Sequence, residues 1–330
     1  MAKKTDNRLE SVIAGLRKDH PEAGIAYVSD IDTTVERIPT GIVALDNILG
    51  GGLPRGKMAE FYGAPAGGKT SAAMKFIAQA QKYGHCVLFD LENAFDPIMA
   101  ENSGIDVDTL LIIEPLCAED TLEMMERLIV LPDIAAVVVD SVAGLVPRAE
   151  IEGDFGDSHV GVIGRLTSQA CRKFESSMKE SNSDTIILWI NQIRDKIGSM
   201  GYGPKTDTTG GKAIKFWSST RVEVTRVGNL KKGDEVIGQE VKVYTQKNRA
   251  YPPFKSDKFK IFYETGISNG SGLVRLLLAA GLLKKSGSWI VDVSTGESLA
   301  QGEDNLAHMF DADQEMFDLW TNSLNKEWEI

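Results

Sequence analysis

A short glycine-bounded segment carries residue types that bind phosphate. The pattern G-x-x-x-x-G-K-[ST] is met by Gly63, Gly68, Lys69 and Thr70. Glycines let backbone N–H groups point inward around phosphate oxygens, and a lysine neutralises their charge. The threonine hydroxyl suits Mg²⁺, which needs only one or two protein oxygens. A glycine-rich turn that happens to end in Lys-Thr is the alternative interpretation.

The residues around the motif favour phosphate binding. An apolar strand from Met58 precedes the loop, and apolar residues follow it at helical spacing, at Ala72, Ala73, Phe76, Ile77 and Ala80. The motif requires this order of strand, loop and helix. We therefore predict a nucleotide-binding loop formed by Gly63, Ala64, Pro65, Ala66, Gly67, Gly68, Lys69, Thr70 and Ser71.

Carboxylates end two further apolar strands. The strand Cys86–Asp90 leads into Glu92 and Asp96, and a continuous apolar run ends in Asp140. Such a run suits a parallel strand that is buried on both faces. Because ligands of open parallel sheets bind at the carboxyl ends of strands, we predict that Asp140 holds Mg²⁺ together with Thr70. A capping aspartate is the alternative.

The rest of the chain predicts an α/β fold with three parts. Residues 34–266 alternate strands and helices, which indicates a twisted, mostly parallel sheet flanked by helices. Residues 1–33 hold a helix over 6–18 and a short strand over 25–28, a unit too small for its own core that we expect to dock on a neighbouring copy rather than on its own domain. Residues 267–330 form a small α+β domain.

Composition restricts the class of protein. An apolar content of 42% allows a full core, and there is no run of 18 apolar residues and no basic-then-apolar start. The three scattered cysteines suggest neither disulfides nor a zinc site. The sequence therefore predicts a cytoplasmic protein without a membrane partner.

The net charge of −11 is unevenly distributed. Residues 292–330 carry ten acidic side chains and one lysine, so this end contributes −9 and residues 1–291 contribute −2. A basic groove elsewhere on the near-neutral body remains compatible with this balance. Two long glycine-rich segments, 150–164 and 193–212, follow strands, and such loops usually bind something.

Three stretches make the chain resemble the RecA family of bacterial and phage recombinases from about Arg8 onward. They begin at Val139 (VDSVAGLVPRAEIEGDFGDSHVG), at Asn191 (NQIRDKIG) and at Thr208 (TTGGKA). The resemblance implies a DNA-dependent ATPase that uses ATP and Mg²⁺. It also implies that many copies form a filament on single-stranded DNA and exchange this strand with homologous double-stranded DNA. A LexA-type repressor of the SOS response is a further partner that the resemblance suggests.

The resemblance also implies roles for individual residues. Glu92 would activate the attacking water, Gln192 would sense the γ-phosphate, and Lys247 and Arg249 would reach the nucleotide of an adjacent subunit. Asp96 and Met99 would lie at the adenine of the nucleotide, although the family usually has a tyrosine where Met99 stands. Residues 64–67, inside the phosphate loop, also differ from the family's usual residues. The DNA-binding positions would be Val160, Arg165, Arg172, Arg194, Lys196, Ile197, Gly198, Thr208, Gly210, Gly211 and Lys212.

Other interpretations stay open. Arg165 and Arg172 also fit a solvated stripe, His159 an ordinary loop histidine, and Phe216 and Trp217 an interface or core. We expect Lys247 and Arg249 to follow the strand Val241–Thr245, and they also fit an exposed edge held out by the break at Pro252-Pro253. For the whole chain, a hexameric helicase on the same core fold is the alternative, and a nucleotide-gated binding module with little hydrolysis is a third.

Overall fold

The computed structural model describes residues 7–21, 23–30, 34–154, 161–195 and 206–327. By their internal contacts the residues divide into two units, Met1–Glu36 and Arg37–Ile330. Each unit is described by itself.

The first unit consists of a helix and a folded-back segment. Helix α1 (Asn7–Asp19) is amphipathic, and Arg17 Nε donates a hydrogen bond to the backbone oxygen of Ile25 at 3.1 Å. The strand predicted over residues 25–28 is wrong, because the described part of this segment leads into a 3₁₀ turn, Val28–Asp30. A strand needs a hydrogen-bonded neighbour, and the described residues of this unit contain no other strand.

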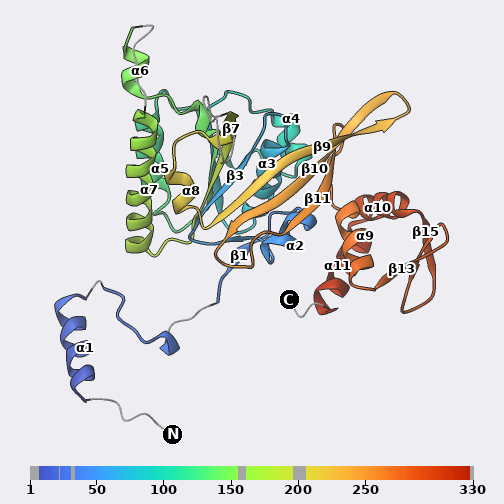
Figure 1. Ribbon diagram of the computed structural model, residues 1–330, viewed down its shortest axis with the longest axis horizontal. Coiled ribbons are helices and arrows are strands. Elements are labelled where there is room, and N and C mark those ends of the chain that lie inside the picture. The colour runs from blue at the N-terminus through green and yellow to red at the C-terminus, as the bar shows by residue number, and fades with distance from the viewer. Residues whose placement is uncertain (1–6, 22, 31–33, 155–160, 196–205, 328–330) are drawn as a thin grey trace, which may run out of the picture. The chain divides into compact units, whose positions relative to one another are not determined.

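The second unit is built on one large sheet (Figure 1). Its strand order is β12-β11-β10-β9-β3-β7-β6-β4-β5. The strands from β9 to β5 pair in parallel, and those from β9 to β12 pair antiparallel. The parallel strands are β3 (Met58–Gly63), β4 (His85–Asp90), β5 (Leu110–Ile113), β6 (Ile134–Asp140) and β7 (Ile186–Asp195). The predicted α/β class with a mostly parallel sheet is confirmed.

Helices cover both faces of this sheet, with α3 on one side and α5 and α7 on the other (Figure 1). Along β6, Ala136 and Val138 pack toward α3, whereas Val137 and Val139 pack toward α5 and α7. This double burial explains the unbroken apolar run in the sequence. The helices are α2 (Val43–Leu49), α3 (Lys69–Ala80), α4 (Pro97–Asn102), α5 (Ala118–Leu128), α6 (Arg148–Glu152), α7 (Val162–Ser181) and α8 (Ala213–Trp217). No helix in the described ranges is long and apolar enough to cross a membrane.

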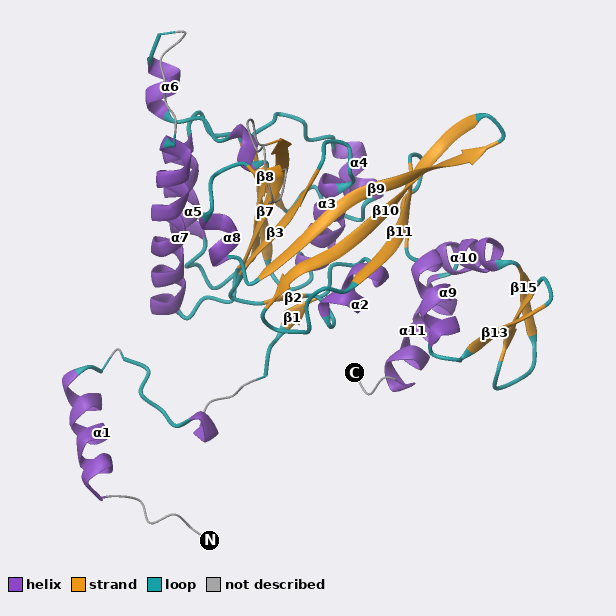
Figure 2. Ribbon diagram, in the orientation of Figure 1, coloured by secondary structure: helices purple, strands orange, loops and turns teal. Residues whose placement is uncertain are grey.

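The antiparallel side of the sheet contains a long hairpin that projects beyond the other strands (Figure 2). It joins β9 (Thr220–Lys232) to β10 (Glu235–Asn248), and β11 (Ser256–Phe262) and β12 (Gly266–Ser268) complete the sheet. We predicted that Lys247 follows the strand, which is wrong. Instead, β10 continues past a bulge and pairs Lys247 with Arg221.

The C-terminal part has its own core and is attached closely to the sheet domain. Asn269 Nδ2 donates to the Gly41 backbone oxygen at 2.7 Å, and Asn269 Oδ1 accepts from the Val43 N–H at 3.2 Å. Leu273, Leu277, Leu306 and Phe310 are among its buried residues. Its elements are α9 (Gly270–Ala279), β13 (Leu283–Ser286), β14 (Trp289–Asp292), β15 (Ser298–Gln301), α10 (Glu303–Ala312) and α11 (Gln314–Glu327).

All three cysteines, Cys86, Cys117 and Cys171, are free and buried. Burial raises the pKa of the Cys86 and Cys171 thiols to about 12. Both thiols are therefore protonated at neutral pH and behave as small apolar side chains of the core.

Candidate nucleotide and DNA site

The phosphate loop, Gly63–Ser71, joins β3 to α3. Glycine is needed at two of its positions because a neighbouring strand leaves no room for a side chain. A Cβ atom on Gly63 would lie 2.1 Å from the Val224 backbone oxygen of β9. One on Gly67 would lie 3.0 Å from the same atom. The side chains of residues 64–66 are exposed instead. Close backbone packing, rather than side-chain contact, therefore shapes the loop.

The helix that follows the loop begins at the candidate phosphate-binding lysine. Gly68 precedes it with a φ of 92°, in the left-handed region that favours glycine. Lys69 is 7% exposed, and its Nζ donates to the Ala64 backbone oxygen at 2.8 Å. Burial lowers the pKa of Lys69, opposed by the carboxylates of Asp140 and Glu92. A hollow of about 150 Å³, lined by residues 66–71, lies at this helix N-terminus, where free N–H groups favour an anion.

Thr70 and Asp140 lie together, although 70 residues separate them in the chain. Thr70 Oγ1 donates to Asp140 Oδ2 at 2.8 Å. Burial, together with the nearby carboxylates of Glu92 and Asp90, raises the pKa of Asp140 to about 6, although the Thr70 hydrogen bond and Lys69 act in the opposite direction. A buried carboxylate beside like charges is stabilised by a divalent cation. This pair of oxygen donors therefore fits Mg²⁺.

The ends of β4, β6 and β7 meet at Glu92. Ser141 Oγ donates to Glu92 Oε1 at 2.5 Å, and Gln192 Nε2 donates to the same oxygen at 2.8 Å. Asp90 shapes the turn that carries Glu92, because its carboxylate accepts from the N–H groups of Glu92 at 3.2 Å and Phe95 at 2.9 Å. Sequence reasoning missed Ser141, which adjoins Asp140, and Asp90, which lies two residues before Glu92.

Asp96 and Met99 lie beyond the end of β4, at the start of α4. The Asp96 carboxylate caps this helix by accepting from the N–H groups of Ile98 at 2.9 Å and Met99 at 3.3 Å. The Met99 side chain is 37% exposed. In the described residues Asp96 therefore has a structural contact, and Met99 offers an accessible apolar surface.

The structure does not bring Lys247 to its own phosphate loop in the ranges it describes. Lys247 Nζ donates to the backbone oxygens of Phe216 at 2.7 Å and Lys215 at 3.1 Å, at the end of α8. Burial, followed by repulsion from Arg249 and Arg221, lowers its pKa to about 8. Lys247 is half-buried rather than exposed as we predicted, whereas Arg249 is exposed.

The two candidate DNA loops, 150–164 and 193–212, contact each other at their C-terminal ends. Thr167 Oγ1 on α7 donates to the Gly210 backbone oxygen at 2.9 Å. Gly211 approaches Gly164 so closely that a Cβ atom on Gly211 would lie 3.3 Å from the Gly164 Cα. Thr208 belongs to β8 (Thr206–Thr208), which pairs with β7. The return of the second loop therefore rests on the helix that follows the first.

Basic residues surround these returns. Arg165 and Arg172 are exposed on α7, Arg172 donates to Ser168 Oγ at 3.0 Å, and Lys212 is exposed before α8. The backbone of Arg194 lies in β7. Several predicted positions lie outside the described residues, namely Val160, Lys196, Ile197 and Gly198, as well as His159.

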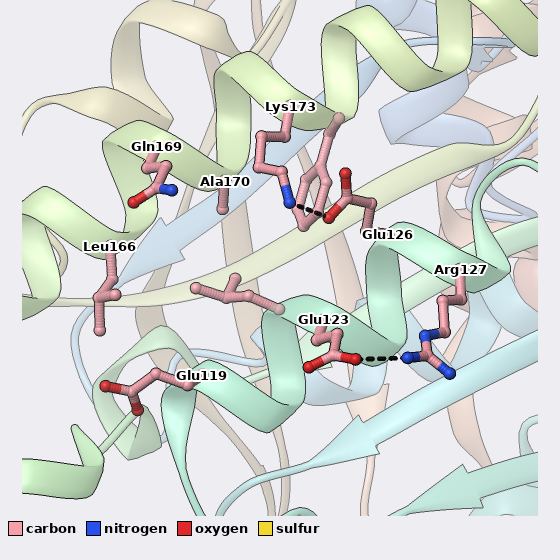
Figure 3. A pocket seen from close by; sticks show the side chains of 10 residues that line it. Glu119, Glu123, Glu126, Arg127, Leu166, Gln169, Ala170 and Lys173 are labelled. Carbon is pink, nitrogen blue, oxygen red and sulfur yellow. Dashed lines mark hydrogen bonds and ion pairs between the residues drawn. The ribbon is translucent and has the colours of Figure 1, made fainter.

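A separate hollow of about 450 Å³ lies between α5 and α7 (Figure 3). Four of its charged side chains pair with each other: Lys173 with Glu126 at 2.5 Å, and Arg127 with Glu123 at 2.5 Å. Its lining includes none of the residues selected from the sequence. We therefore assign it no part in the candidate site.

The parallel sheet and the loop at its carboxyl edge define a P-loop nucleotide-binding protein. The family model of the RecA N-terminal domain matches residues 7–268. The curated Protein RecA of Nocardioides sp. is 43% identical over 303 residues, which cover 91% of this chain and 85% of that protein. Protein RecA of Colwellia psychrerythraea is 42% identical, over 94% of this chain and 90% of that protein. Protein RecA of Methylococcus capsulatus is 46% identical, over 86% of this chain and 79% of that protein.

The chain belongs to the RecA family. It is accordingly a nucleotide-binding, DNA-dependent ATPase and a recombinase of DNA repair, and the alternative of a hexameric helicase is not favoured. Membership of the family also implies binding to DNA and assembly into filaments.

Proposed function

We propose that the chain hydrolyses ATP with Mg²⁺ at the phosphate loop. Lys69 and the N–H groups at the start of α3 bind the phosphates, and Thr70 and Asp140 hold the metal ion. Mg²⁺, when bound, neutralises phosphate charge. Glu92 accepts a proton from the attacking water, and Ser141 and Gln192 orient its carboxylate through the bonds of 2.5 and 2.8 Å.

The hydrogen bond between Gln192 and Glu92 carries the proposed link to DNA. Gln192 lies on the strand from which the second loop departs, and its side chain reaches the candidate general base. A γ-phosphate that attracts the Gln192 amide would shift this strand end and reorder the loop. ATP would thereby control DNA affinity.

We propose that the two loops bind the DNA backbone without reading base edges. Arg165, Arg172, Arg194, Lys196 and Lys212 would supply the charge, on single-stranded DNA and on its homologous duplex. Stacked copies form the filament, and Lys247 and Arg249 reach the γ-phosphate of the adjacent subunit. The contacts of Lys247 with α8, away from its own phosphate loop, support this role in trans. The setting is cytoplasmic, and a LexA-type repressor is a partner to test.

Electron microscopy with single-stranded DNA and a slowly hydrolysed ATP analogue tests the proposal. We expect long helical filaments with the analogue and few with ADP. The matched control is Lys69→Ala, which loses the loop's only side-chain cation and should form few filaments in either case. Closed rings, or no assembly of the unmodified protein, would contradict the proposal.

A further inference from the structure

A buried polar cluster lies beneath the phosphate loop and the second loop. Glu60 on β3 is fully buried, and its Oε2 accepts from Arg221 Nε at 2.5 Å. The Arg221 guanidinium also lies 4.5 Å from the centre of the Tyr62 ring. Asn191 Nδ2 donates to the other carboxylate oxygen, Glu60 Oε1, at 2.9 Å. A buried ion pair needs such additional partners, because an unmet lone pair in the interior is costly.

Asn191 also closes the base of the second loop. Its Nδ2 donates to the Thr209 backbone oxygen at 3.0 Å, and its Oδ1 accepts from the Gln192 N–H at 2.9 Å. The Thr209 N–H in turn lies 3.3 Å from the Gln192 backbone oxygen. One fully buried side chain therefore contacts Gln192 on β7 and Thr209 after β8, the two positions between which the second loop lies.

Of two consecutive residues of β7, Gln192 contacts the nucleotide site and Asn191 contacts the base of the second loop. Successive side chains of a strand point to opposite faces. Gln192 donates to Glu92 at 2.8 Å, whereas Asn191 contacts Glu60 and Thr209. Because Glu60 lies on the strand that runs into Gly63, the loop base is tied directly to the phosphate loop.

We propose that Asn191 is a positioning residue for nucleotide-controlled DNA binding, because it clamps both ends of the second loop to Glu60 on the strand that leads into the phosphate loop. This inference rests on the proposed function. A movement of Gln192 at the γ-phosphate changes the DNA-binding part of the loop only if the base of the loop is held. If the base of the second loop is free to shift, the movement of Gln192 displaces only that base and does not change the residues that contact DNA.

A charge-swapped pair of substitutions separates this role from a purely structural one. Asn191→Asp keeps the size of the side chain and the acceptor for the Gln192 N–H, but it places a carboxylate against Glu60 and the Thr209 carbonyl. Adding Glu60→Gln restores the net charge beside Arg221, and the new amide can donate to the new carboxylate. The bond to the Thr209 carbonyl is not restored, since a carboxylate has no proton to donate.

The experiment measures single-stranded DNA affinity by fluorescence anisotropy, with the slowly hydrolysed ATP analogue and with ADP. In the double variant we expect the ratio of the two affinities to fall about 10-fold, the effect of one lost buried hydrogen bond. The melting temperature and the affinity for a fluorescent ATP analogue should stay close to those of the unmodified protein. The single variant Asn191→Asp should lose both the ratio and stability.

A folded double variant with an unchanged ratio would overturn the inference, and so would one that no longer binds nucleotide. An unmodified protein whose DNA affinity ignores the nucleotide would instead refute the proposed function. If the double variant does not fold, hydrogen exchange on the unmodified protein decides. The amides of Gln192 and Thr209 should then exchange more slowly with the analogue than with ADP, and equal rates would refute the clamp.

Discussion

Glu92 combines exposure to solvent with two hydrogen-bond donors, Ser141 and Gln192, on one carboxylate oxygen. Two donors on one oxygen fix the orientation of the carboxylate, and a general base must be held toward the water that it deprotonates. The second oxygen has no donor from these two residues, which leaves it available to a water molecule.

Glu92→Gln should lower DNA-stimulated ATP hydrolysis by about 100-fold or more, because an amide cannot accept the proton. ATP and DNA should still bind, as size and shape are kept. Ser141→Ala, which removes only the orienting hydroxyl, is the matched comparison and should cost less, about 10-fold. Steady-state hydrolysis and a fluorescent-nucleotide titration measure both. Loss of nucleotide binding in Glu92→Gln would reveal a structural role instead.

Asp46 gives a prediction about stability and pH. The Asp46 carboxylate accepts from the Thr40 N–H and hydroxyl at 2.7 Å each, yet burial raises its pKa from 3.8 to about 6. The folded protein therefore binds more protons than the unfolded chain between these values. The stability that the carboxyl contributes is complete below pH 3.8 and is lost as the pH rises through about 6.

Asp46→Asn should remove this dependence, since the amide keeps an acceptor oxygen without a charge. Between pH 4 and 7 the free energy of unfolding of the variant should rise relative to the unmodified protein by about 2 kcal/mol, most of the full effect of about 1.4 kcal/mol for each pKa unit. Urea denaturation of both proteins across this range measures the difference. A constant difference would mean that Asp46 titrates normally.

At the residue scale, what the sequence could predict depended on how local the pattern was. The phosphate loop was visible because its residues are contiguous and their spacing is fixed by the ligand. The pairing of Thr70 with Asp140 needed only the rule that strand ends meet at one edge. The roles of Asp90 and Asn191 depend on backbone N–H and carbonyl positions, which no sequence pattern displays.

Among the elements, β10 shows why strand ends were harder to predict. The proline pair after Tyr251 was taken to end the strand early, but β10 extends to Asn248 because its partner β9 extends equally far in the other direction. Strand length here is set by the neighbouring strand, which lies outside any local window. The same reasoning applies to residues 25–28, whose β-type composition meets no partner strand in the described part of their own unit.

The second loop gives the prediction that belongs to this scale. Arg194→Ala combined with Lys196→Ala should weaken single-stranded DNA binding and reduce DNA-stimulated hydrolysis. On a plot of log affinity against log salt concentration, the slope should become shallower by roughly 1.4, about 0.7 for each lost phosphate contact. The matched control is Lys231→Ala with Lys232→Ala, two exposed lysines of the β9–β10 hairpin. An unchanged slope would count against loop contact.

For the whole molecule, the proposed role of Lys247 predicts that the ATP site is completed only on assembly. We expect Lys247→Ala and Glu92→Gln proteins to be inactive alone with DNA. Mixed in equal amounts, they should regain part of the hydrolysis rate, because some interfaces then pair an intact Glu92 with an intact Lys247. If Lys247 serves its own chain, every subunit keeps one defect and the mixture stays inactive. A mixture of Lys247→Ala with Lys247→Gln protein, in which no subunit has a cation at this position, is the control for nonspecific rescue.

The three buried cysteines have a practical consequence. Maleimide reagents attack thiolates at the surface, and Cys86, Cys117 and Cys171 are 0%, 6% and 0% exposed. A cysteine introduced at an exposed position, such as Ala64 beside the phosphate loop, would then be the only thiol to react quickly. A fluorophore could be attached there without removing any native cysteine. A chain labelled in this way would allow single molecules to be followed while filaments grow and exchange DNA strands.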